Sequence, residues 1–138
     1  MDSNLYTNEA AIAEAAIIQA DLALSKMRLF DSTLIPDVTT VKADMVAAET
    51  GLIGYPAGGY ALTAWSDPQL VSGGGAAITS PMVPVDYASG AAAPLGGGWV
   101  EDAAGDVRLV FVFDPPRVLS AVGDGFQWVR QLVYGRNS

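Results

Sequence analysis

The chain has 138 residues, a formal net charge of −8 and a sequence pI of about 4.1, and only 16% of its residues are charged. This length fits a single domain over residues 1–138, and the acidity disfavours nucleic acid and an anionic membrane as partners, because both attract basic surfaces. The sequence contains no Cys and no His, which excludes disulfides, thiolate catalysis and histidine-based proton transfer. We therefore expect a non-enzymatic protein with no catalytic residue, no cofactor and no metal site.

Residues 5–26 predict an apolar helix that Asn4 or Thr7 can cap. Glu9 near its start and Lys26 near its end suit the helix dipole. The apolar side chains form two overlapping strips, one of Ile12, Ala16 and Ala20 and the other of Leu5, Ile12, Ala15, Ile18 and Leu22. The many alanines keep the helix thin, which allows a close neighbour. The helix either covers a sheet of its own chain or serves as an arm between copies, and both alternatives stay open.

A short strand is predicted at residues 27–30, followed by a second, short helix at residues 40–49. Thr39 or Thr40 is expected to cap this helix, and Gly51 is expected to stop it.

From Gly54 onwards the apolar pattern changes to a period of two, which predicts β-strands. The predicted strands cover residues 60–65, 77–86, 99–101, 108–113 and 126–134. Pro81 and Pro84 each remove a backbone donor, so the strand at 77–86 is expected to be an edge strand or to be broken by a bulge.

Residues 102–106 predict the turn of a hairpin between the strands at 99–101 and 108–113. Both faces of the second arm are apolar through its middle, which predicts a central or sandwiched strand. The sequence Asp114-Pro115-Pro116 is expected to end that arm. The Gly/Ala/Pro-rich residues 89–98 predict a loop.

Together these elements predict an α+β fold that is mainly β: an antiparallel β-barrel or sandwich with an apolar N-terminal helix and one short extra helix. Residues 1–26 contain the helix, which is a candidate interaction arm, and residues 27–138 form the β-rich body.

Two groups of carboxylates are candidates for a metal-binding or a catalytic site. Glu101, Asp102 and Asp106 gather at the predicted hairpin turn, where three carboxylates either bind Ca²⁺ or form a solvated turn; the missing EF-hand alternation favours the turn. Asp37 and Asp44 either form a carboxylate pair of the glycosidase kind or cap the short helix, and capping explains them better.

The aromatic residues are candidates for a sugar-stacking platform, although aromatics on strands more often lie in a core or an interface. They are Trp65, Trp99, Trp128, Tyr55, Tyr60 and Tyr87. The glycine runs at 58–59, 73–75 and 96–98 lack the spacing of phosphate-binding loops, so they predict turns or loops.

The shortage of charge predicts a surface that other subunits cover, although a monomer with a Ser/Thr/Gly surface is the alternative. We expect a homo-oligomer, with a trimer as the favoured number. The C-terminal arginines are locally positive on an acidic chain and suit an acidic patch on a neighbour. The predicted interface residues are Leu5, Ile12, Ile17, Ile18, Leu22, Arg117, Arg130 and Arg136.

The order of features resembles a family of small structural proteins of tailed bacteriophage virions. The matching segments are Met27-Arg28-Leu29-Phe30, Ile35-Pro36-Asp37-Val38-Thr39-Thr40, Val41-Lys42-Ala43-Asp44, Ala48-Glu49, Gly54-Tyr55 and Ala61-Leu62-Thr63-Ala64-Trp65. The C-terminal half matches in character only, through Gly98-Trp99-Val100-Glu101-Asp102, Phe111-Val112-Phe113-Asp114 and Pro115-Pro116.

The resemblance implies a virion component without catalytic residues, such as a capsid cement or decoration protein. Its partners would then be the major capsid protein or other virion proteins. The alternative that the resemblance leaves open is a tail, baseplate or fibre module that contacts host glycan through Trp65 or Trp99. A small enzyme with paired carboxylates is the least favoured reading.

Overall fold

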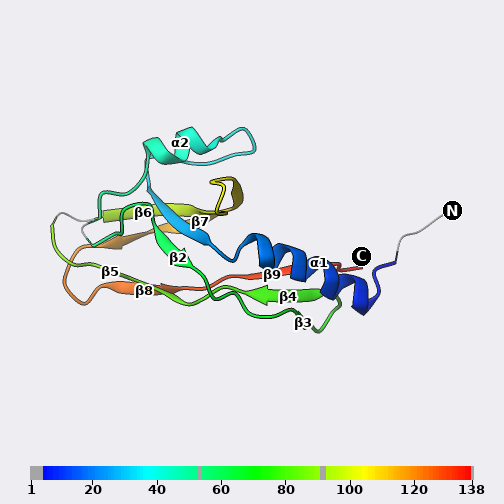
Figure 1. Cartoon of the computed structure of the whole chain (residues 1–138). Helices are drawn as coiled ribbons and strands as arrows, with labels where there is room; N and C mark the ends of the chain where they lie inside the picture. The colour runs from blue at the N-terminus through cyan, green and yellow to red at the C-terminus, as the bar shows by residue number, and fades with distance from the viewer. Residues whose placement is uncertain (1–4, 53, 91–92, 138) are drawn as a thin grey trace.

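The computed structural model describes residues 5–52, 54–90 and 93–137, so Asn4, one of the two predicted helix caps, lies outside the described residues. Strands predominate along the chain (Figure 1). The elements are α1 (Asn8–Asp21), β1 (Ser25–Asp31), α2 (Lys42–Ala47), β2 (Tyr60–Leu62), β3 (Gln69–Leu70), β4 (Ala76–Thr79), β5 (Val83–Asp86), β6 (Ala93–Glu101), β7 (Val107–Leu119), β8 (Gly125–Trp128) and β9 (Gln131–Tyr134).

The strands form three antiparallel sheets with the orders β2-β1-β6-β7, β3-β4-β9 and β5-β8. The α+β, mainly β prediction is therefore confirmed. Its finer barrel or sandwich detail is not, because the sheets of the described residues do not close into a barrel.

The two smaller sheets are two halves of one long ribbon, which is interrupted where β4 passes into β5 and β8 passes into β9 (Figure 1). At the interruption the Ser80 N–H donates to the Arg130 carbonyl, and the Arg130 N–H donates to the Ser80 hydroxyl, both at 2.8 Å. Pro81, which follows, has no N–H to continue the ladder. The predicted strand at 77–86 is thus divided into β4 and β5. Its second alternative is right about the break but not about a bulge, and the unbroken strand predicted at 126–134 is wrong.

Helix α1 is shorter than predicted at both ends, because Thr7 caps its start and Lys26 already belongs to β1. Thr7 is the cap, since its hydroxyl accepts from the Ala10 N–H at 3.1 Å. The chain leaves the helix at a buried corner where the Ser25 hydroxyl donates to the Leu22 carbonyl at 2.8 Å and accepts from the Trp65 indole N–H at 3.0 Å.

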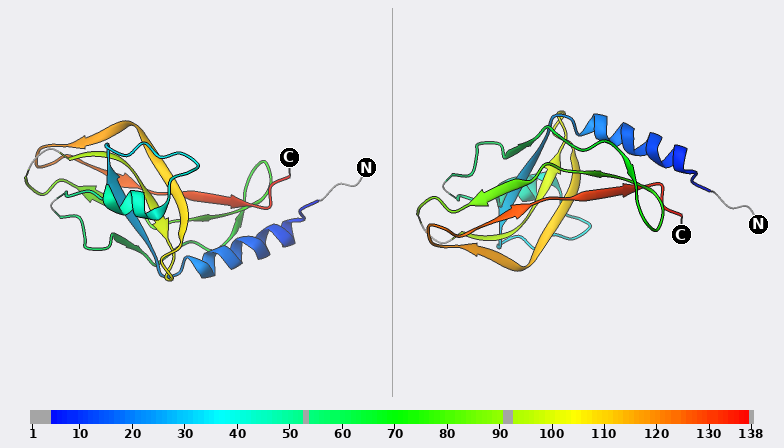
Figure 2. Two further views of the ribbon diagram at one scale, coloured as in Figure 1. Left: turned by 90° about the horizontal axis from the view of Figure 1, so that it is seen from above. Right: turned by 90° about the horizontal axis from the view of Figure 1, so that it is seen from below.

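One face of α1 lies along β4 and β9 (Figures 1 and 2). Ala11, Ala15 and Leu22 are buried in the main core, and Ile18 packs against it. The second predicted strip is therefore right for Ala15, Ile18 and Leu22 but wrong for Leu5 and Ile12, which are exposed. Helix α1 lies close to the C-terminal segment at Gly135, where an added Cβ would lie only 2.7 Å from the Ala11 Cβ. Asn137 also exchanges two hydrogen bonds with the Tyr6 backbone, at 2.9 and 3.0 Å, and so fastens the start of α1 to the C-terminal segment.

The glycines at 96–98 belong to β6, which pairs with β1 on one side and β7 on the other. The loop predicted at 89–98 is therefore wrong from residue 93 onwards, and residues 91–92 lie outside the described residues. A Cβ on Gly97 would lie 2.8 Å from the Phe30 ring, and one on Gly98 would lie 2.6 Å from the Phe111 ring. Two aromatic rings thus occupy the space that side chains on β6 would fill.

Strand β7 also departs from its prediction. It runs through Pro115 and Pro116 with a cis Asp114-Pro115 peptide bond instead of ending before them. Among the described strands it pairs with β6 alone, so it is an edge strand and the predicted central position is wrong. The sandwiched alternative is wrong as well, because Phe111 and Phe113 are buried on one face whereas Val110 and Val112 are exposed on the other.

Replacing Gly98 by Ala tests the close packing of β6. The added methyl group would collide with the Arg28 carbonyl oxygen and the Phe111 ring, so we expect the free energy of unfolding to fall by roughly 2–3 kcal/mol, as for an overpacked core. Urea denaturation followed by far-UV circular dichroism measures it. The matched control is Gly51→Ala, where nothing lies within 4 Å of the added Cβ; a loss no larger than that of the control would contradict the packing argument.

Candidate functional site

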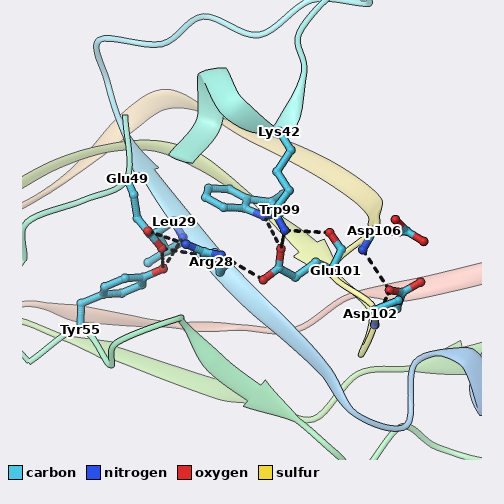
Figure 3. A network of polar contacts seen from close by, with 11 residues as sticks. Arg28, Leu29, Lys42, Glu49, Tyr55, Trp99, Glu101, Asp102 and Asp106 are labelled. Atoms are coloured by element: carbon cyan, nitrogen blue, oxygen red, sulfur yellow. Dashed lines mark hydrogen bonds and ion pairs between the residues drawn. The ribbon is translucent and has the colours of Figure 1, made fainter. Parts of the chain in front are cut away.

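The densest group of charged side chains surrounds Arg28 on β1 (Figure 3). Its guanidinium donates two hydrogen bonds to the Glu49 carboxylate, at 2.9 and 2.7 Å, and a third to Glu101 at 3.0 Å. Lys42 at the start of α2 reaches the other Glu101 oxygen at 2.7 Å. The guanidinium also lies 5.0 Å from the centroid of the Trp99 ring. Two cations and two carboxylates therefore neutralise one another over the outer face of the sheet.

Tyr55 completes this network, because its hydroxyl donates to Glu49 at 2.6 Å and accepts from the Leu29 N–H at 3.1 Å (Figure 3). Burial raises the pKa of the Tyr55 hydroxyl, and the bond to Glu49 raises it further. The segment between α2 and β2 is thus held to β1 by side-chain contacts.

The pKa values of the two carboxyls follow from these contacts. Hydrogen bonds from Arg28 lower the pKa of the Glu49 carboxyl below its ordinary 4.5. Burial raises the pKa of the Glu101 carboxyl, but hydrogen bonds from Lys42 and Arg28 outweigh burial and hold it below 4.5 as well. Both groups stay ionised at neutral pH, which suits holding elements together and not donating a proton.

The three carboxylates of the predicted hairpin turn do not converge. Glu101 belongs to the Arg28 network, whereas Asp102 caps its own turn by accepting from the backbone N–H groups of Ala104 and Asp106 at 3.0 Å. Asp102 also pairs with Arg108 at 3.5 Å. In residues 5–52, 54–90 and 93–137, no group of three or more ligating side chains is placed to hold a metal ion.

The capping prediction is confirmed for Asp44, whereas Asp37 closes the turn before α2 and does not cap the helix. Asp37 accepts from the Thr39 N–H at 2.8 Å, and Asp44 accepts from the Val41 N–H at 3.0 Å. The residue before α2 is Val41, so the predicted caps Thr39 and Thr40 are wrong. Thr40 instead accepts from the Asp37 N–H at 2.9 Å, inside the preceding turn.

The sugar-stacking alternative fails for the tryptophans, because Trp65, Trp99 and Trp128 are all buried. The tyrosines Tyr55, Tyr60 and Tyr87 are partly buried and pack against the main core. The aromatic side chains singled out in the sequence thus serve packing.

The predicted interface residues fall into three places. Leu22 lies in the core and Ile18 packs against it, so the exposed side of the helix consists of Leu5, Ile12, Ile17 and the following Leu24. Arg136 donates to the Gly74 carbonyl at 3.3 Å. Arg117 and Arg130 are brought together at a groove of about 470 Å³ between β7 and β8.

The Arg28 network is not predictable from local sequence patterns. The sequence places Glu101 among the acidic residues of a turn, and the partners of its carboxylate lie 73 and 59 positions away along the chain. Within the described part of the chain, no helix has the length and apolar character needed to cross a membrane. Comparisons with protein-family models, with curated proteins and with solved structures give no match.

The Arg28 network predicts a pH-dependent stability. Because both carboxyl pKa values are lower in the folded chain, their contribution is present above about pH 4.5 and is lost as the pH falls through the lowered values. We expect Glu101→Gln to reduce the free energy of unfolding by about 3 kcal/mol at pH 7, because it leaves two cations short of a partner, and by much less at pH 3.

Urea denaturation at the two pH values measures this effect, with Asp106→Asn on the same hairpin as the control. Asp106 is exposed, so its substitution should change stability by no more than about 0.5 kcal/mol. An effect of Glu101→Gln that is equal at both pH values would contradict the charge pairing.

Proposed function

We propose that this chain is a non-enzymatic structural protein of a virion, most specifically a capsid cement or decoration protein that stabilises the shell by protein–protein contacts. The observation that carries the proposal is the exposure of large apolar side chains on a surface that is poor in charge. Leu5, Ile17 and Leu24 are 77%, 63% and 66% exposed, and Ile35 and Val38 in the loop before α2 are 87% and 103% exposed.

These side chains gain free energy when another protein covers them. Apolar burial contributes about 25 cal/mol per Å², from which the ordering of the partners subtracts. On a symmetric shell the same small contact recurs many times, and each one formed raises the effective concentration of the next. A protein that acts in this way needs surface shape and apolar area, not reactive side chains.

The proposed partners are the major capsid protein or other virion proteins, together with further copies of this chain in a homo-oligomer for which a trimer is the favoured number. The segment resemblance to small structural proteins of tailed phages supports a place in the virion. A position in the tail, baseplate or fibre is the second candidate, with the exposed apolar loop before α2 as its contact.

The exposed side of α1 is the first surface to test. The double substitution Ile17→Ser and Leu24→Ser removes two exposed apolar side chains and leaves the buried Ala11 and Ala15 untouched. We expect the oligomer to dissociate to monomers at concentrations where the wild type stays assembled, with an unchanged far-UV circular dichroism spectrum. Size-exclusion chromatography with light scattering measures the mass.

The control for this experiment is Val122→Ser, which alters a still more exposed apolar residue between β7 and β8. A wild-type chain that is monomeric throughout would contradict the homo-oligomer, and a double variant that assembles as the wild type does would exclude α1 as the contact.

The virion role has its own test, which is whether the chain sediments with phage particles through a density gradient and where a reconstruction of those particles places it. We expect stoichiometric recovery with the particles and density on the outside of the head. Density at the tail, baseplate or fibre would favour the second candidate. Recovery in the particle-free fractions alone would contradict both.

A further inference from the structure

The groove between β7 and β8 is lined by two unbroken runs of residues, 112–117 and 126–130. Successive side chains of a strand point to opposite faces of its sheet. Because consecutive residues line the groove, the groove runs along the edges of the two strands and not over one face of a sheet. Both edges are available: β7 pairs with β6 and β8 pairs with β5, and neither has a second partner in the described sheets (Figure 2). A five-residue turn, 120–124, joins the two strands, yet they do not pair with each other.

Two arginines of this groove lie over aromatic rings: Arg117 lies over rings that line the groove, and Arg130 lies over a ring next to it. The Arg117 guanidinium is 5.2 Å from the centroid of the Phe113 ring and 4.8 Å from that of Phe126. The Arg130 guanidinium is 5.3 Å from the centroid of the Phe111 ring. Stacking on rings holds a guanidinium in place while its N–H groups remain able to donate.

Neither arginine forms an ion pair with a described residue, although Arg28, Lys42 and Arg108 each do. Asp114 also lines the groove, so two cations face one carboxylate there on a chain whose net charge is −8. The lining of the groove therefore carries one more positive than negative charge, which favours an anionic partner. Asp124 lines the adjoining cavity with Arg117, but its carboxylate accepts from backbone N–H groups of its own turn.

Trp128 supplies an independent observation. It lines the groove and is only 3% exposed, and its indole N–H finds no acceptor among the described residues. Buried donors are almost always paired, so the chain alone leaves one donor unsatisfied in a residue of the groove wall.

We propose that the β7–β8 groove binds an extended, carboxylate-bearing segment of a partner protein, which adds its backbone to the free edge of β8 and places its acidic side chains against Arg117 and Arg130. The β8 edge is favoured because Pro115 and Pro116 remove N–H donors from β7, whereas Gly125–Trp128 contains no proline. Strand addition provides affinity through main-chain bonds, and side chains at alternate positions provide selectivity. The inference concerns this surface alone and does not rest on a place in the virion.

Fluorescence anisotropy with a fluorescein-labelled peptide of alternating valine and glutamate tests the groove directly on the full chain. We expect saturable binding that weakens as salt is added. The double variant Arg117→Gln and Arg130→Gln should weaken binding at least about tenfold, because charge-assisted hydrogen bonds are lost. A peptide with lysine in place of each glutamate should not bind.

Arg136→Gln is the matched control, because it removes a cation outside the groove. Near-UV circular dichroism establishes that each variant keeps its fold. The proposal is overturned if the glutamate peptide fails to bind at millimolar concentration, if the lysine peptide binds equally well, or if Arg136→Gln weakens binding as much as the groove variant does.

Sedimentation velocity of the unlabelled chain distinguishes a second copy as the occupant. A dimer that forms in the wild type and is lost in the Arg117→Gln and Arg130→Gln variant would assign the groove to self-association and overturn the assignment to a different partner. Wild-type and variant chains of equal mass, together with binding of the glutamate peptide, are the results that the proposal expects.

Discussion

The close approach of three backbones at β6 is the constraint on which the rest of the structure depends. Gly97 and Gly98 bring β6 so near to β1 and β7 that a Cβ at either position would collide with a neighbouring carbonyl oxygen. The Phe30 and Phe111 rings fill the space over these glycines from the two flanking strands. An isolated glycine weakens a strand, but aromatic rings packed against it restore the lost contacts.

The position of β6 determines where the Arg28 network and the β7–β8 groove lie. β6 ends at Glu101, whose carboxylate joins Arg28 on β1 to Lys42 on α2, so the network of charges sits where the close-packed sheet ends. On its other side β6 pairs with β7, so the edge of β7 that faces away from β6 lies along the groove. The groove and the network are thus on opposite flanks of the same element. The apolar side of α1 is independent of it, because α1 packs on β4 and β9.

Local features were readable from the sequence, and features that depend on distant partners were not. The Thr7 cap and the turns of Asp37 and Asp44 were identifiable because donor and acceptor are three residues apart or fewer. The sequence wrongly predicts a loop for the glycines at 96–98, because their packing depends on Phe30 and Phe111. These two residues lie beside the glycines in the fold but far from them along the chain. For the same reason the apolar pattern of β7 predicted a strand correctly but could not tell an edge position from a central one.

Native-state hydrogen exchange at the β6 amides tests the central claim most directly. If the glycine run is a paired strand between β1 and β7, those backbone N–H groups of Gly96, Gly97 and Gly98 that are bonded to neighbouring strands exchange as slowly as the slowest amides of the molecule, through global unfolding. Exchange of all three amides as fast as that of the turn glycines Gly73 and Gly74 would show that the segment is a loop, and would contradict the account.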